Sequence, residues 1–129
     1  MANTELEICG LVRNRADNIA HLQDRLALFR GDLCDPDWVA GVIKEIEPDY
    51  IFHLAAQAFV PLAWQDPWGT LENNIRGELN LLEAVIALGM GPRILIVGSG
   101  DEYGLVYSDE LPVRETNPLR PYNPYAVSK

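Results

Sequence analysis

Arg93-Ile94-Leu95-Ile96-Val97 is an almost wholly apolar run, and Gly98-Ser99-Gly100-Asp101-Glu102-Tyr103-Gly104 follows it directly. An unbroken apolar run of this length is typical of a parallel strand with both faces covered. The glycines after it allow a sharp turn, where a hydroxyl, two carboxylates and a phenol gather. A bland turn would also explain the glycines. Ligands of parallel α/β sheets bind at the carboxyl ends of strands, so this stretch predicts both a fold class and a site.

Helices and strands alternate on the N-terminal side of this stretch. A helix is predicted from Asp66-Pro67 to Gly89, because Asp caps helices, Pro fits the first turn and Gly ends them. Its apolar residues recur every three or four positions, as one helix face requires: Leu71, Ile75, Leu79, Leu82, Val85 and Ile86. A second helix should run from Asp35-Pro36 to Pro48-Asp49. Further strands are predicted over residues 6–12, 26–30 and 50–54, with a loop and a short helix over 13–24.

On the C-terminal side, a long loop rich in Pro, Gly and Asp leads to a last helix opened by Asn123-Pro124. Strands separated by helices imply parallel pairing with right-handed crossovers. The sequence therefore predicts an α/β fold with a doubly wound parallel sheet. Its 129 residues suffice for one domain.

Composition narrows the classes of partner and compartment. The net charge of −9 disfavours nucleic acid and anionic membranes, which would be repelled over most of the surface. No apolar run reaches the roughly 18 residues of a membrane span, and the N-terminus lacks the pattern of a secretion signal. Cys9 and Cys34 show no metal-ligand spacing and are interpreted as small buried residues in a reducing compartment. We therefore expect a cytoplasmic protein with no metal site.

The ends of the first two strands carry residues suited to adenosine. Arg13 and Arg15 follow the first strand, and a guanidinium there accommodates a ribose 2′-phosphate, which favours NADP over NAD. A solvated basic loop is an equal alternative. Asp32 and Leu33 follow the second strand, where the carboxylate could bind the adenine amino group and the leucine could cover the ring. A simple strand-to-helix turn explains the same residues.

The third strand end and the last helix carry further candidates. Leu54, Ala55, Ala56 and Gln57 end the third strand with small side chains, which allow close approach of a ligand or close packing of a helix. Tyr125 and Lys129 are four apart on the last helix and so lie side by side. A neighbouring ammonium stabilises the ionised phenol, which makes Tyr125 a candidate general acid or base.

Together these motifs resemble the extended short-chain dehydrogenase/reductase family, whose members act on nucleotide-diphosphate sugars. The matching pieces, in the family's order, are Gly31-Asp32-Leu33, Phe52-His53-Leu54-Ala55-Ala56-Gln57, Asn74-Ile75-Arg76-Gly77, Asn80-Leu81-Leu82-Glu83-Ala84, Ser99 to Gly104, and Pro124-Tyr125-Ala126-Val127-Ser128-Lys129. Within the family the chain is most similar to GDP-mannose 4,6-dehydratases and GDP-4-dehydro-6-deoxymannose reductases. The resemblance implies a Rossmann-like fold, NADP or alternatively NAD as cofactor, and a homo-oligomeric full-length enzyme.

The resemblance also implies roles for individual residues. Ser99 would hydrogen-bond the sugar hydroxyl, Tyr125 would take its proton, and Lys129 would hold the nicotinamide ribose. Asp32 and Leu33 would hold adenine. The segment from Ala55 to Gln57 would line the pyrophosphate and ribose path, and Asn74 would lie near the cofactor.

Asp101 decides between the reactions that the family performs. Dehydration needs a further carboxylate two residues after the serine, and GDP-mannose dehydratases usually carry glutamate there. Asp101 is one methylene shorter, so a 4-keto reductase and an epimerase stay open beside the dehydratase. Glu102 should point the opposite way if the segment is extended.

The family's Gly-rich first turn does not occur before Leu6, and the sequence ends on Lys129. We therefore expect residues 1–129 to form part of a nucleotide-binding domain, without its first strand and without a substrate domain, and to be inactive alone. Two other classes of protein compete with this interpretation. One is a non-catalytic nucleotide-binding Rossmann module, and the other is an unrelated α/β protein that matches by accident.

Overall fold

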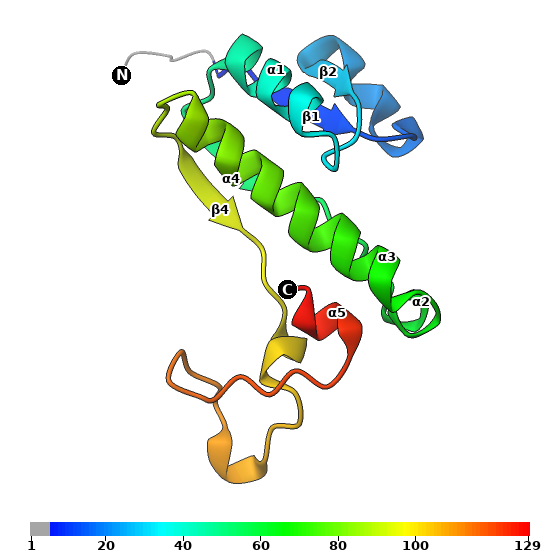
Figure 1. Ribbon diagram of the computed structural model, residues 1–129, viewed down its shortest axis with the longest axis vertical. Coiled ribbons are helices and arrows are strands. Elements are labelled where there is room, and N and C mark those ends of the chain that lie inside the picture. The colour runs from blue at the N-terminus through cyan, green and yellow to red at the C-terminus, as the bar shows by residue number, and fades with distance from the viewer. Residues whose placement is uncertain (1–5) are drawn as a thin grey trace.

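The computed structural model describes residues 6–129, in which short strands alternate with helices (Figure 1). In chain order the elements are β1 (Cys9–Val12), the 3₁₀ helix η1 (Asp17–Arg25), β2 (Ala27–Arg30), α1 (Pro36–Ile46), β3 (Tyr50–His53), α2 (Val60–Gln65), α3 (Pro67–Leu71), the π-helical turn η2 (Glu72–Arg76), α4 (Gly77–Ala87), β4 (Arg93–Ile96), the 3₁₀ helices η3 (Gly100–Tyr103) and η4 (Ser108–Glu110), and α5 (Pro124–Val127). The predicted α/β alternation is confirmed.

The strands of the described chain form two parallel pairs. β1 pairs with β2, with Cys9 opposite Ala27 and Val12 opposite Arg30. β3 pairs with β4, with Tyr50 opposite Arg93 and His53 opposite Ile96. Each register brings the carboxyl ends of a pair level with each other. The segments that follow the paired strands therefore start side by side.

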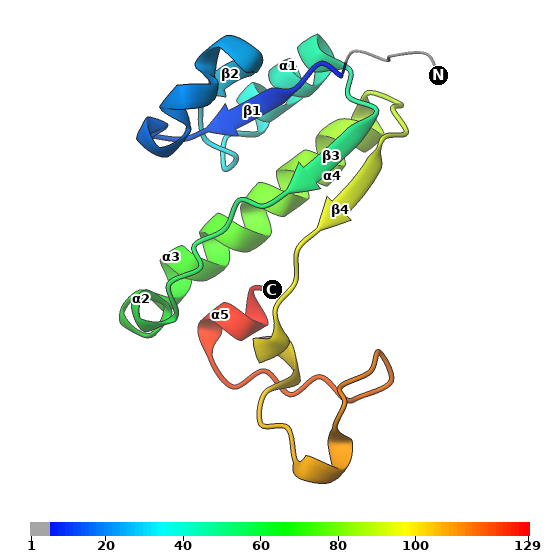
Figure 2. The ribbon, with the colours of Figure 1, turned by 180° about the vertical axis from the view of Figure 1, so that it is seen from behind.

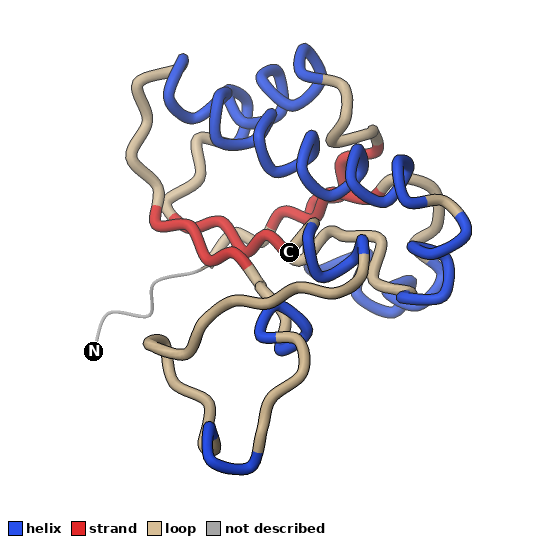
Figure 3. The backbone as a smooth tube through the Cα atoms, turned by 60° about the horizontal axis from the view of Figure 1, so that its bottom comes forward, coloured by secondary structure: helices blue, strands red, loops and turns tan. Residues whose placement is uncertain are grey.

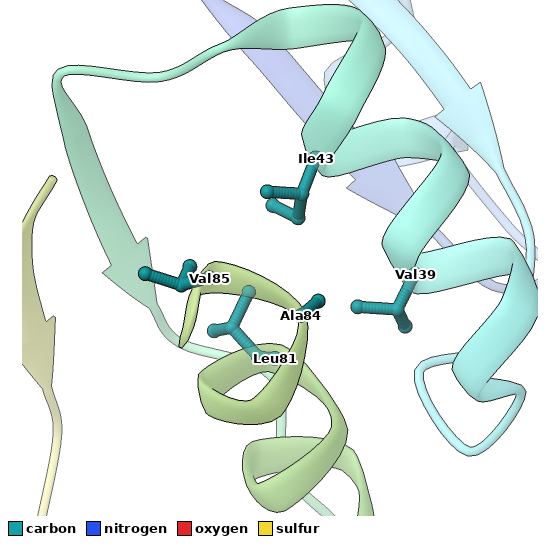
Figure 4. Close-up of a cluster of buried hydrophobic side chains, with 5 residues drawn as sticks. All are labelled: Val39, Ile43, Leu81, Ala84 and Val85. Carbon is teal, nitrogen blue, oxygen red and sulfur yellow. The ribbon is translucent and has the colours of Figure 1, made fainter. Parts of the chain in front are cut away.

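α1 and α4 lie together over one side of the strands (Figures 1 and 3). Val39 and Ile43 of α1 point toward Leu81, Ala84 and Val85 of α4, and these five side chains form the buried core (Figure 4). Ile51 and Ile94 of the strand pair pack against the same cluster from the sheet side. Burial of apolar side chains between two helices and a sheet is the arrangement that the helical periodicity predicts.

Capping residues begin the helices where the sequence predicts them. The Asp35 carboxylate accepts hydrogen bonds from Asp37 N and Trp38 N at 3.1 Å each, and α1 begins at the next residue. The Asp66 carboxylate accepts from Gly69 N at 2.9 Å at the start of α3. These bonds satisfy backbone donors that a helix N-terminus leaves free.

Three local predictions need correction. The first strand begins at Cys9 and not at residue 6, because Leu6 and Ile8 are 83% and 56% exposed and have no apolar layer to cover them. The helix predicted from residue 66 is interrupted by the π-helical turn η2, and α2 precedes it unpredicted. The strand at 93–97 is not covered on both faces, since Leu95 and Val97 are 52% and 42% exposed and the helices of the described chain pack on the other side.

None of the helices in residues 6–129 combines the length and the apolar character needed to cross a lipid bilayer.

Candidate cofactor and catalytic site

Arg13 and Asp32, the residues that follow β1 and β2, form an ion pair at the surface. Arg13 Nε lies 3.0 Å from Asp32 Oδ2, and the two side chains are 58% and 38% exposed. Arg13 Nη1 also donates a 2.9 Å hydrogen bond to Asn73 Oδ1 of η2. The other Asp32 oxygen accepts from Cys34 N at 2.9 Å, which fixes the turn before α1. Two residues predicted for the adenosine end of a dinucleotide are therefore adjacent and accessible.

The same carboxylate affects Cys34. Partial burial raises the pKa of the Cys34 thiol, and the negative charge of Asp32 raises it further. Both causes disfavour the thiolate, which is the reactive form of cysteine. Cys9 and Cys34 are both free.

Arg15 and Leu33 take no part in this ion pair. Arg15 Nη2 pairs with Asp17 Oδ2 at 2.7 Å, with 85% of the arginine side chain exposed. Leu33 packs against the core, and a Cβ added at Gly77 would lie only 3.2 Å from Leu33 Cβ. The Leu33 carbonyl accepts a 2.8 Å hydrogen bond from Asn80 Nδ2. The leucine is therefore held on the α4 side of its turn.

The loop after β3 has exposed Leu54 and Ala55 and an anchored Gln57. Gln57 N donates to Asn74 Oδ1 at 2.7 Å, and Gln57 Nε2 donates to Thr70 Oγ1 at 3.1 Å. Gln57 Oε1 accepts from Phe59 N at 2.6 Å. The Gln57 side chain therefore braces the loop against α3.

Asn74 lies in η2 and is buried. Besides accepting from Gln57 N, its side chain donates to Gln57 O at 3.2 Å and to Ser128 Oγ of the last helical segment at 2.8 Å. π-helical turns occur often at functional sites. Sequence reasoning identified Asn74 and missed Ser128, because the partner of Ser128 lies 54 residues away in the sequence.

Ser99 and Glu102 form a capping box at the start of η3. Ser99 Oγ accepts from Asp101 N at 3.2 Å, and the Glu102 carboxylate accepts from Ser99 N. The segment from Ser99 to Glu102 is therefore a capped helical turn and not an extended one, so the condition on which Glu102 was expected to point away from Asp101 is not met. The Ser-x-x-Glu pattern from 99 to 102 is the sequence signal of a capping box and could have revealed this turn.

Asp101 contacts the start of the helix that carries Tyr125. Asn123 Nδ2 donates to Asp101 Oδ2 at 3.4 Å, while Asn123 Oδ1 accepts from Ala126 N at 2.7 Å and caps α5. Tyr125 is half-buried in this helix. The turn after β4 and the Tyr125 helix are thereby held together.

Lys129 lies close enough to the end of β3 to affect His53. Burial lowers the pKa of His53, the Glu78 carboxylate raises it, and the positive charge of Lys129 lowers it. The loop after β3 is also joined to the last helical segment through Asn74, and that segment contacts the turn after β4. The predicted site residues other than Arg15 and Leu33 fall into two groups. Arg13 and Asp32 form one. Asn74 of η2, the segments after β3 and after β4, and α5 with the adjoining Lys129 form the other.

Within residues 6–129, no group of three or more His, Cys, Asp or Glu side chains could hold a metal ion.

The chain is similar to nucleotide-sugar enzymes over most of its length. It is 46% identical over 100 residues to GDP-6-deoxy-D-mannose reductase of Pseudomonas aeruginosa, a match that covers 78% of this chain and 33% of that protein. It is 40% identical over 104 residues to GDP-mannose 4,6-dehydratase of Yersinia enterocolitica, covering 79% of this chain and 27% of that protein. The chain thus spans about a third or less of the curated relatives that it matches.

Solved structures give the same result. The structure of RMD from Pseudomonas aeruginosa complexed with NADPH superposes with a TM-score of 0.72 at 39% identity, covering 92% of this chain and 45% of that one. UDP-glucose 4-epimerase of Thermus thermophilus in complex with NAD gives a TM-score of 0.83 at 35% identity, covering 96% and 40%. Together with a family profile for GDP-mannose 4,6 dehydratase that matches residues 2–129, these likenesses show that the chain belongs to the GDP-mannose 4,6 dehydratase family of NAD(P)-dependent, Rossmann-fold enzymes.

Proposed function

We propose that the chain is part of the nucleotide-binding domain of a GDP-mannose 4,6-dehydratase that uses NADP in the cytoplasm. The observation that carries the proposal is the joining of three segments. Asp101 after β4 is hydrogen-bonded to Asn123 of the Tyr125 helix, and Asn74 links that helix to the loop after β3. Both cysteines are free, which fits a reducing compartment.

The side chains fit a nicotinamide dinucleotide. Arg13 is 58% exposed and can turn from Asp32 toward a 2′-phosphate, for which a planar guanidinium is well suited. That movement would free the Asp32 carboxylate for the adenine amino group. Ala55 and Ala56 offer backbone without bulky side chains to the pyrophosphate and ribose. The chemistry that bound NADP would supply is the transfer of a hydride from the sugar to the nicotinamide and back to the sugar.

In this proposal Tyr125 removes the proton from the sugar C4 hydroxyl, which Ser99 holds by a hydrogen bond. Lys129 orients the nicotinamide ribose beside Tyr125. Asp101, next to the Tyr125 helix, would take the C5 proton and give it to the C6 hydroxyl, which leaves as water as the C5–C6 double bond forms. Ser99 Oγ accepts from Asp101 N at 3.2 Å through a lone pair, so its own proton can still be donated to the sugar oxygen.

A GDP-4-dehydro-6-deoxymannose reductase is the second candidate. It is favoured by the 46% identity to a reductase and by the aspartate at 101, whose carboxylate reaches less far than that of glutamate. A reductase needs Ser99, Tyr125 and Lys129 but no elimination base. An epimerase shares the same three residues.

One assay separates the dehydratase from the reductase. The full-length protein is incubated with GDP-mannose and NADP, and in parallel with GDP-4-dehydro-6-deoxymannose and NADPH. A dehydratase converts the first mixture to the 4-keto-6-deoxy product without net consumption of cofactor, and Asp101→Asn stops it. A reductase oxidises NADPH only in the second mixture and tolerates Asp101→Asn. Tyr125→Phe should abolish either activity, and NADP binding without turnover of any nucleotide sugar would favour a non-catalytic module.

A further inference from the structure

We infer that Ser128 is a positioning residue, whose buried hydroxyl ties α5, which carries Tyr125, and the adjoining Lys129 to the loop after β3 through Asn74. The inference rests on the proposed function for its catalytic consequence. Its geometry rests on hydrogen bonds alone.

Ser128 follows α5 directly and is 7% exposed. Its Oγ donates to the Tyr125 carbonyl at 2.7 Å and accepts from Asn74 Nδ2 at 2.8 Å. A hydroxyl has one proton to donate, so the first bond uses the donor and the second uses a lone pair. The hydroxyl therefore connects the backbone of Tyr125 to a side chain on another element.

The Asn74 amide has one orientation that satisfies every bond. Its Oδ1 accepts from Gln57 N at 2.7 Å and from Asn73 Nδ2 at 3.1 Å. Its Nδ2 donates to Gln57 O at 3.2 Å and to Ser128 Oγ. All four hydrogen-bonding positions of the amide are filled, so a flip would oppose donors to donors. A fully bonded buried amide is a rigid link between η2, the β3 loop and Ser128.

Removing the hydroxyl of Ser128 removes both of its hydrogen bonds, the one from Asn74 Nδ2 and the one to the Tyr125 carbonyl. Ser128→Ala leaves one Asn74 N–H without a partner in a buried place, which costs more than the bond itself contributes. Tyr125 O keeps its bond from Ser128 N at 2.9 Å, so the helical turn survives. The expected change is a shift of the turn bearing Tyr125 and Lys129 relative to the β3 loop. Small misplacements of reacting groups reduce rates strongly.

The test is a double-mutant cycle in the full-length enzyme with Ser128→Ala, Asn74→Ala and the double variant. We expect kcat of Ser128→Ala to fall about tenfold, as loss of one buried hydrogen bond would give, with KM for the sugar nucleotide unchanged. The double variant should be no slower than Asn74→Ala, because both changes remove the same contact. Ser128→Thr keeps the hydroxyl and should recover kcat. Ser108→Ala, at an exposed serine of η4, is the control.

The inference would be overturned if the losses in kcat of Ser128→Ala and Asn74→Ala added up in the double variant. It would also be overturned if the fall in kcat came with an equal rise in KM. Hydrogen exchange of the same variants gives a readout that needs no turnover. Ser128→Ala should speed exchange over residues 54–59 and 123–129 and leave β1 and β2 unchanged. If the wild type turns over no sugar nucleotide, the proposed function fails while the exchange result still decides the role of Ser128. If hydrogen exchange of Ser128→Ala were unchanged over both residues 54–59 and residues 123–129, the positioning role of Ser128 would be contradicted.

Discussion

We expect His53, at the end of β3, to make the stability of the fold depend on pH. It is 7% exposed, and burial lowers its pKa from 6.5, with Lys129 lowering it further against the opposing effect of Glu78. The folded protein therefore takes up this proton at lower pH than the unfolded chain. Unfolding binds a proton between the two pKa values, so stability is lost as pH falls through 6.5.

We predict that His53→Gln reduces this pH dependence. Urea unfolding at about pH 7.5 and about pH 5.5 should show a smaller loss of unfolding free energy on acidification in the variant than in the wild type. Most carboxylates stay ionised over this window, so the histidine contribution is isolated. Equal losses in both proteins would show that His53 is not the responsible group.

At the scale of the element, the turn after β4 is held against the segment before α5 at Gly104. Gly104 has φ of 63°, and a Cβ there would lie 2.0 Å from the Arg120 carbonyl oxygen. Arg120 N donates to Glu102 O at 2.9 Å in the same place. The Arg120 guanidinium pairs with Glu110 and lies 5.6 Å from the centre of the Tyr107 ring. These contacts hold the long loop close to Asp101.

Gly104→Ala should therefore destabilise the protein and Gly100→Ala should not. We expect the first to cost about 2 kcal/mol or more, from the strained backbone and the clash with Arg120. A Cβ at Gly100 meets nothing within 4 Å, so its cost should stay below about 1 kcal/mol. Urea unfolding of both variants provides the comparison. A similar loss at the two positions would contradict the close approach at Gly104.

The elements also show what the sequence could predict. Asp35, Asp66 and Asn123 cap helices where their position before proline predicts it, because capping depends on residues within one turn. The π-helical turn η2 was not predictable, since Asn74 bonds to residues 17 and 54 positions away. The alternation of strand and helix patterns in the sequence was enough to predict that the candidate site residues follow the strand ends. The ion pair of Arg13 with Asp32 and the bracing role of Gln57 depend on tertiary packing, which local patterns do not contain.

At the scale of the whole molecule, the chain exposes an apolar sheet face. The accessible surface area of the chain is 9392 Å². A folded monomer of 14.4 kDa is expected to expose about 6,800 Å². Tyr50, Phe52 and Leu95 alternate with the core-facing Ile51 and Ile94 and so share the other face of the β3–β4 pair, with 60%, 65% and 52% exposure. Figure 2 shows this strand pair in front of α4. The sequence predicted a covered strand here, but strand patterns do not specify which chain supplies the cover.

We predict that the 129-residue chain associates with itself through this face. Phe52→Lys should shift the chain toward monomer in light scattering and size-exclusion chromatography, because a charge in an apolar interface must be desolvated. Leu119→Lys adds the same charge at a residue of similar exposure, 62%, on the long loop, and should leave association unchanged. Equal effects of the two variants would show that net charge controls association.

The central claim is that Ser99, Tyr125 and Lys129 act at one place. The most direct measurement is a crystal structure of the full-length protein with NADP and a GDP-sugar bound. We predict Ser99 Oγ and Tyr125 Oη within about 3 Å of the same sugar hydroxyl, with Lys129 Nζ on the nicotinamide ribose. A bound sugar whose reacting hydroxyl contacts neither Ser99 nor Tyr125 would contradict the account.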